Sequence, residues 1–342
     1  MVDAELTPRQ FEILHRLVEE FIGTGQPVGS KNLVERAGME VSPSTVRHEL
    51  AELEAFGLLT HPHTSAGRVP TEAGYRFYAS ALLARLDPRP PAFPLDLSAV
   101  RSQVDYALEA TTEMLSQLTR LAALVSAPPL ESSTVRHVEV LLLQPQVVMV
   151  VAITSTGGVT KRVVAFDEVV DSGLVEWAAE YLNERVGGLQ LGSSRLRRAF
   201  DDPDLSARER SFLDALRPAF TELLHAEQRL YVSGTAGILD DVRAEELATH
   251  RRLLEVLEQR AALLRILGEA TARRPFVRVG GDLDPHLSGV ALVGASYGVA
   301  HRTLGAVSLL GPLRMDYETA LQTVRGAAQE LSRFVEEVYS ES

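Results

Sequence analysis

The stretch SPSTVRHELAELEAFGLLTHPHTSAGRVPT, residues 42–71, predicts a helix followed directly by a small β-ribbon. Ser42 is a favoured helix N-cap residue, Pro43 suits the first helical position, and Gly57 is a typical residue to end the helix. Short extended segments at residues 58–59 and 68–69 flank a turn rich in Pro, Gly, Ser and His. A helix and ribbon in this order are the recognition half of a winged helix-turn-helix.

The predicted helix has one apolar face and one small, polar face. At about 100° per residue, the apolar side chains that share a face are Val46, Leu50 and Leu53. The side chains that point away from it are Ser44, His48 and Ala51, with Arg47 on the flank. The outward face is therefore polar and partly cationic.

The charge distribution supports a local DNA contact rather than a generally basic domain. Residues 1–80 contain seven Lys and Arg residues against eleven Asp and Glu residues. However, neither 41–48 nor 55–71 contains an acid, and both contain Arg or His. DNA repels carboxylates, so an acidic domain binds it through a surface cleared of them. The alternative is a winged helix that binds protein through a neutral face.

Whole-chain composition restricts the possible classes of protein. The 342 residues allow two or three domains, and the net charge of −12 opposes unspecific binding to nucleic acid. Cysteine is absent, which excludes disulfides and thiol chemistry. No signal peptide pattern is present at the N-terminus, and the longest apolar run, 147–153, is too short to cross a bilayer. We expect a cytoplasmic, nucleoid-associated protein.

The residues around the recognition helix complete the predicted domain. Thr7, Pro8 and Gln10 form a capping box that begins a first helix, and Ser30 begins a second. A last helix begins near Thr71, and its aromatic residues are spaced for packing rather than for base stacking: Tyr75, Phe77 and Tyr78.

Two adjacent motifs in this region resemble the heat-inducible transcription repressors of the HrcA family: PSTVRHELAELEAFGLL from residue 43 and TSAGRVPTEAGYRFY from residue 64. The resemblance implies a dimeric repressor that binds an inverted-repeat operator upstream of chaperone genes. It also implies an α+β architecture, in which an N-terminal winged helix precedes a GAF-like α/β domain interrupted by a mostly helical inserted dimerising domain. The implied activity is linked to the chaperonin GroEL.

The rest of the chain is assigned to domains from its apolar patterns. A Pro-rich linker at 86–96 should separate the winged helix from the body. Helical seams with heptad-like spacing are expected at 97–125 and 317–338. They either lie together on one face of a sheet, which the family resemblance implies and we favour, or form a coiled coil between chains. Strand patterns between them predict one sheet split by about a hundred residues. The expected limits are 1–85 for the winged helix, 97–167 and 250–342 for the GAF-like domain, and 168–249 for the insertion.

Several apparent catalytic or metal motifs fail in their context. Gly294 to Gly298 matches G-x-S-x-G around Ser296, but a strand rather than a helix should follow, and the possible partners His301 and Asp316 come in the wrong order. Two wing histidines lack further metal ligands nearby. The arginines at 195, 197 and 198 form a basic cluster whose field nearby aspartates should offset. We therefore predict no enzyme, no metal and no cofactor.

The favoured function is a DNA-binding repressor of heat-shock genes that binds double-stranded DNA as a homodimer. The candidate DNA-binding residues are Ser42, Ser44, Thr45, Arg47, His48, His61, His63, Ser65 and Arg68. The alternatives are a winged-helix regulator controlled by a small ligand in the GAF-like domain, and a hydrolase built on Ser296.

Overall fold

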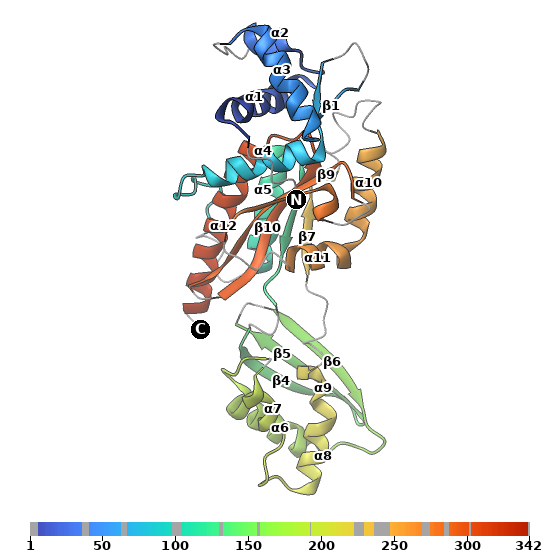
Figure 1. Ribbon diagram of the computed structural model, residues 1–342. Coiled ribbons are helices and arrows are strands. Elements are labelled where there is room, and N and C mark those ends of the chain that lie inside the picture. Colours follow the sequence, from blue (N-terminus) through green and yellow to red (C-terminus); the bar gives the residue numbers. More distant parts are fainter. Residues whose placement is uncertain are drawn as a thin grey trace.

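The structure of the protein is a computed structural model (Figure 1). It describes residues 6–35, 41–62, 67–97, 104–129, 133–155, 158–191, 193–221, 229–235, 247–268, 274–283, 287–300 and 302–340. Three tiers follow one another along its length: the winged helix, a central domain and an insertion. Within the described residues, no helix is both long and apolar enough to span a membrane.

The N-terminal tier has the predicted order of elements. It consists of α1 (Pro8–Thr24), α2 (Ser30–Glu35), α3 (Pro43–Ala55), β1 (Leu59–Thr60), β2 (Val69–Pro70) and α4 (Glu72–Ala84). The capping box of Thr7 and Gln10 and the Ser42 cap are both present, as their sequences indicated. Leu17, Leu50 and Leu53 are buried where these helices meet. The predicted winged helix-turn-helix is therefore confirmed.

The central domain is a five-stranded antiparallel sheet between two layers of helices. Its strand order is β7-β3-β10-β9-β8, and the strands are β3 (Ala122–Ser126), β7 (Leu230–Ser233), β8 (Phe276–Val279), β9 (Val290–Val299) and β10 (Arg302–Pro312). A short 3₁₀ helix, η5 (Gly280–Asp282), follows β8. One layer contains α5 (Val104–Thr119) and α12 (Tyr317–Ser340), and the other contains α10 (Leu247–Glu258) and α11 (Arg260–Gly268).

Two details of the central domain differ from the sequence prediction. The helical seam expected to reach residue 125 ends at Thr119, because Arg120 takes the left-handed conformation with φ 57° and the chain turns into β3. The spacing of Leu253, Leu257, Leu264 and Leu267 in the sequence predicts one long helix, but this segment forms two helices, α10 and α11. The favoured arrangement of the two seams is confirmed, since α5 and α12 pack on each other within the chain.

The insertion has its own sheet and its own apolar core. It runs from 133 to 221 and contains β4 (Val135–Gln144), β5 (Val147–Thr154), β6 (Val159–Ala165), α6 (Ser172–Val186), α7 (Ser194–Ala199), α8 (Ala207–Leu216) and α9 (Pro218–Thr221). The strands form a separate sheet, β4-β5-β6, so their assignment to the central sheet was wrong. Conversely, β7 lay within the expected insertion but pairs with β3. The mixed α+β class is confirmed.

The winged helix packs directly on the central domain through α4. The rings of Tyr75 and Tyr78 lie 6.0 and 6.1 Å from the ring of the buried Tyr317, measured between centroids. The Pro-rich linker lies against α12, where Arg325 donates a hydrogen bond to the Asp87 carbonyl. The sequence predicted that the linker separates the winged helix from the body. This prediction was wrong, because the winged helix and the central domain share one apolar core.

Candidate nucleic-acid interface

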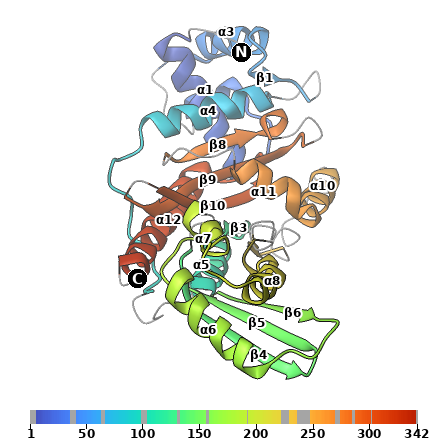
Figure 2. The ribbon, with the colours of Figure 1, turned by 90° about the horizontal axis from the view of Figure 1, so that it is seen from below.

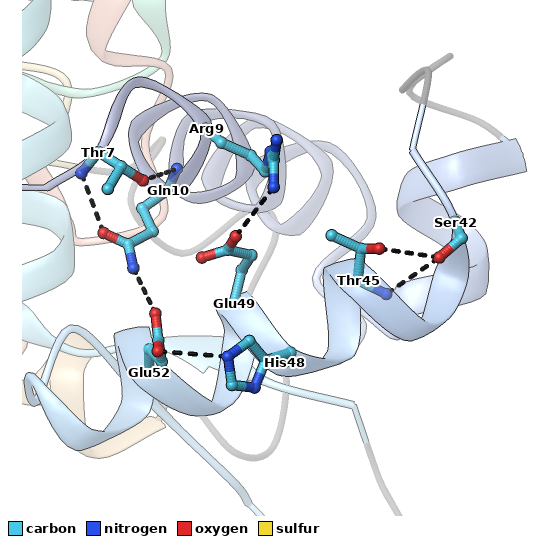
Figure 3. Close-up of polar contacts among 8 residues, drawn as sticks. All are labelled: Thr7, Arg9, Gln10, Ser42, Thr45, His48, Glu49 and Glu52. Atoms are coloured by element: carbon cyan, nitrogen blue, oxygen red, sulfur yellow. Dashed lines mark hydrogen bonds and ion pairs between the residues drawn. The ribbon is translucent and has the colours of Figure 1, made fainter.

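The N-terminal turn of α3 presents small hydroxyl side chains at the surface. The Ser42 hydroxyl accepts a hydrogen bond from the Thr45 backbone N–H at 3.2 Å and lies 2.9 Å from the Thr45 hydroxyl. It also lies 2.7 Å from the hydroxyl of Ser44, which is exposed. Figure 3 shows how the cap fixes the first turn of the helix. These short side chains allow another surface to approach the helix front closely.

Arg47 is an exposed cation of this surface. Its side chain is exposed, and within the described part of the chain no carboxylate lies within salt-bridge distance of it. The nearby Glu49 is 9% exposed and pairs instead with Arg9 of α1, at 3.5 Å. The field of the Arg47 guanidinium is therefore not cancelled by an ion pair within the protein.

His48 is held by a chain of polar contacts that reaches the start of α1 (Figure 3). Its Nε2 lies 3.3 Å from Glu52 Oε1, and Gln10 Nε2 donates a hydrogen bond to Glu52 Oε2 at 2.6 Å. The Gln10 side chain also accepts from the Thr7 backbone N–H at 3.0 Å, as part of the capping box. The His48 side chain is 74% exposed. It therefore has a defined orientation and remains accessible.

A carboxylate near the end of α3, Glu54, contacts the wing, and the sequence analysis missed this contact. Glu54 Oε1 lies 2.5 Å from His61 Nδ1, and Glu54 Oε2 accepts from Arg68 Nε at 3.2 Å. The hydrogen bond with His61 lowers the pKa of Glu54; burial opposes this, and Arg68 adds to the lowering. The acid-free window begins one residue later, at Ala55, so a count along the sequence could not show that the wing folds back onto Glu54.

The same contacts restrict Arg68. Its side chain is only 14% exposed, and its backbone N–H and C=O pair with Val28 at 2.9 Å each. A Cβ at the adjacent Gly67 would overlap the Val28 backbone, so glycine is required for this close approach. Arg68 therefore lies in the wing as predicted, but its guanidinium group is paired with the Glu54 carboxylate.

The remaining sequence candidates fall into two groups. His63 and Ser65 lie outside the described residues, so their contribution to the wing stays a prediction. Ser296 lies within β9 and is opposite Ala306 of β10, so a strand follows it as expected and the strand-to-helix elbow of a hydrolase is absent there. In the described part of the chain, no three His, Asp or Glu side chains gather closely enough to hold a metal ion.

Comparisons with known proteins agree with a regulator of transcription. The family model described as "HrcA protein C terminal domain" matches residues 105–321. A heat-inducible transcription repressor HrcA from Parafrankia sp. (strain EAN1pec) is 35% identical over 95% of this chain and 97% of its own length. One of the same name from Mycolicibacterium smegmatis is 34% identical, over 94% and 95% respectively.

Among solved structures, one titled as a hypothetical protein has a TM-score of 0.62 at 22% identity and covers 98% of this chain and 99% of its own. This likeness shows the fold alone. The relatives are named as repressors rather than enzymes, and they do not favour the alternative of a regulator controlled by a small ligand.

Proposed function

Because this chain belongs to the HrcA family of heat-inducible transcription repressors, we propose that it represses chaperone genes by binding an inverted-repeat operator as a homodimer. The observation that carries the proposal is the exposed front of α3, where Arg47 has no carboxylate partner among the described residues. An acidic protein has little affinity for DNA elsewhere on its surface, so this front is where binding must be local and specific.

The proposed reading residues are those at the front of α3. A winged helix inserts its recognition helix into the major groove, and we propose that Arg47 donates two hydrogen bonds to a guanine there. Ser42, Ser44 and Thr45 lie at the helix start, and we propose that their hydroxyls contact phosphate. His48, held by Glu52, faces the groove one residue beyond Arg47.

The wing is proposed to contact phosphate or the minor groove through His61 and Arg68, together with His63 and Ser65. Glu54 neutralises part of the charge of Arg68 and forms a hydrogen bond with His61. The wing therefore contributes a weaker positive field than its sequence indicates, and Arg47 is the stronger contributor.

The homodimer is proposed to form through the outer face of the sheet β4-β5-β6. On this face, neighbouring strands place Leu141, Met149 and Val163 side by side. Further along the same face, Ile153 lies beside Val159. Leu141, Val159 and Val163 are 41%, 63% and 57% exposed. Exposed apolar side chains gathered on one sheet face are typical of an interface, and a two-fold dimer would match the symmetry of an inverted repeat.

The chaperonin GroEL is proposed as a further partner on the basis of the family resemblance. A gel shift with the promoter of a chaperone operon, run with and without chaperonin, tests both parts of the proposal. We expect the protein to retard the inverted repeat but not a scrambled duplex of equal length, and chaperonin to increase the retarded fraction. Equal retardation of the two duplexes would refute the operator assignment.

A further inference from the structure

The helical side of the insertion carries an arginine surface that the proposed function does not use. We define this arginine surface as Arg195, Arg197 and Arg198, which are all exposed on α7. Within the described residues, none of the three has a carboxylate within salt-bridge distance. The hydrogen bond that Arg198 donates within the described part of the chain goes to the backbone carbonyl of Ser194, at 3.3 Å. Three positive charges therefore remain uncompensated by ion pairs on one short helix.

Among the described residues, none of the acids expected from the sequence to offset this cluster forms an ion pair with it. Asp201 pairs with Arg217 at 2.6 Å. Asp202 pairs with Arg185 at 3.2 Å and accepts a hydrogen bond from the Tyr181 hydroxyl at 3.2 Å. Asp204 is exposed and is not paired with any of the three arginines. The expectation that nearby aspartates cancel the cluster is thus not met by direct pairing.

The arginine surface borders a hollow that is partly lined by the aromatic ring of Tyr181. The hollow measures about 550 Å³ and is lined by Tyr181, Arg185, Arg195 and Arg198, among others. The ring of Tyr181 stacks on Trp177 with centroids 5.2 Å apart. Its hydroxyl donates to the Ala199 carbonyl at 2.9 Å, which fixes α7 against α6. The arginines therefore project from a supported platform rather than from a loop.

We propose that the arginine surface docks an acidic peptide segment of a partner protein. Carboxylates of such a segment would pair with the free guanidinium groups, and its backbone or an apolar side chain would enter the hollow beside Tyr181. A peptide can place its carboxylates beside the arginines and uncharged residues beside Asp201 and Asp202, which also line the hollow. A nucleic acid carries a charge at every phosphate and would bring some of these charges to the two aspartates, so it fits less well.

The position of the arginine surface leaves it accessible during the proposed repressor activity. Figures 1 and 2 show α6 and α7 covering the sheet β4-β5-β6 from one side, so they lie opposite the face proposed for the dimer. Figure 1 also places the insertion at the far end of the molecule from α3. Operator DNA on α3 and a peptide on α7 can therefore bind at the same time, and the two proposals can fail independently.

The test uses the full chain and a fluorescein-labelled decapeptide containing six glutamates, followed by fluorescence anisotropy. We expect saturable binding that weakens between about 50 and about 200 mM NaCl, because exposed ion pairs are screened by salt. The double variant Arg195→Ser, Arg198→Ser should bind at least about fivefold more weakly, with unchanged operator binding. Arg208→Ser is the matched control, because Arg208 is 67% exposed in the same insertion but already pairs with Asp171. The Arg208→Ser variant should bind the peptide with the same affinity as the wild type.

Three results would overturn the proposal. The first is no binding of the glutamate peptide by the wild type, and the second is equal binding by the wild type and the double serine variant. The third is tighter binding of a labelled oligothymidylate that is lost in the double serine variant, which would assign the surface to nucleic acid. The variant Arg195→Lys, Arg198→Lys should keep most of the affinity for the peptide, and melting curves should show that all variants fold.

Discussion

The Arg76 side chain of α4 donates a hydrogen bond to Asp282 of η5 at 2.6 Å, and so connects the winged helix to the central domain. One turn earlier on α4, the Glu72 carboxylate accepts from the Gly289 backbone N–H at 2.8 Å. It also lies against Gly280, where φ is 53° and a Cβ would overlap the carboxylate. These contacts fix the orientation of α4, and thereby of the reading helix, relative to the central domain.

The two contacts of α4 should differ in their effect on stability. Glu72→Ala leaves a partly buried backbone N–H without its partner, which we expect to lower the free energy of unfolding by about 1–3 kcal/mol. Arg76→Ala removes an ion pair whose side chains are 45% and 42% exposed, and should cost less than about 1 kcal/mol. Urea unfolding of the two variants measures the difference. The opposite order would show that the contact of Glu72 with the body is unimportant.

Arg47 should contribute to sequence discrimination. Loss of a bidentate contact with guanine costs about 1–3 kcal/mol, so we expect Arg47→Ala to weaken operator binding about 5- to 150-fold and to weaken binding to random duplex much less. Arg16→Ala is a suitable control, because Arg16 pairs with Glu19 on α1. Titrations of both duplexes at the same salt concentration measure the ratio, and equal losses on the two duplexes would exclude base reading by Arg47.

Glu54 should weaken the contact between the wing and DNA. Glu54→Gln removes the negative charge that His61 and Arg68 share. We therefore expect the variant to bind both operator and random DNA more tightly, with a steeper dependence of affinity on salt. Arg68→Ala should make the dependence shallower. If Glu54→Gln leaves the salt slope unchanged, the wing does not approach the phosphates.

The winged helix could be predicted from the sequence because its signals are local. Thr7 and Ser42 each cap a helix within three residues, and the structure confirms both. Glu54 was missed because its partners, seven and fourteen residues away, meet it only when the wing folds back.

Sheet membership could not be predicted in the same way. The strand β7 pairs with β3 across about a hundred residues, and an apolar pattern in either segment does not identify its partner. The pattern in β5 is equally compatible with the central sheet and with the separate sheet that it forms. The left-handed turn that ends α5 could not be predicted either, because the residue that adopts it is Arg120 rather than a glycine.

The stability of the wing should depend on pH through Glu54. Its pKa in the folded protein is lowered from the ordinary value of 4.5, so its contacts stabilise the folded state above about pH 4.5. This contribution is lost as the pH falls from that value through the lower pKa of the folded state. We expect the melting temperature of wild type to fall more than that of Glu54→Gln over this interval. If the melting temperatures of the two proteins fall in parallel with pH, the contacts of Glu54 with His61 and Arg68 do not stabilise the folded state.

The proposed dimer should depend on the outer face of β6. A charge introduced by Val163→Glu must be buried at the interface or remain unpaired within it, so we expect dissociation into monomers at micromolar concentration. Lys161→Glu, on the same face of the strand, changes charge at a position that is already polar and should be tolerated better. Sedimentation equilibrium gives the mass of each variant. A monomeric Val163→Glu that still folds should lose affinity for the full inverted repeat much more than for one half-site, because only a dimer engages both half-sites.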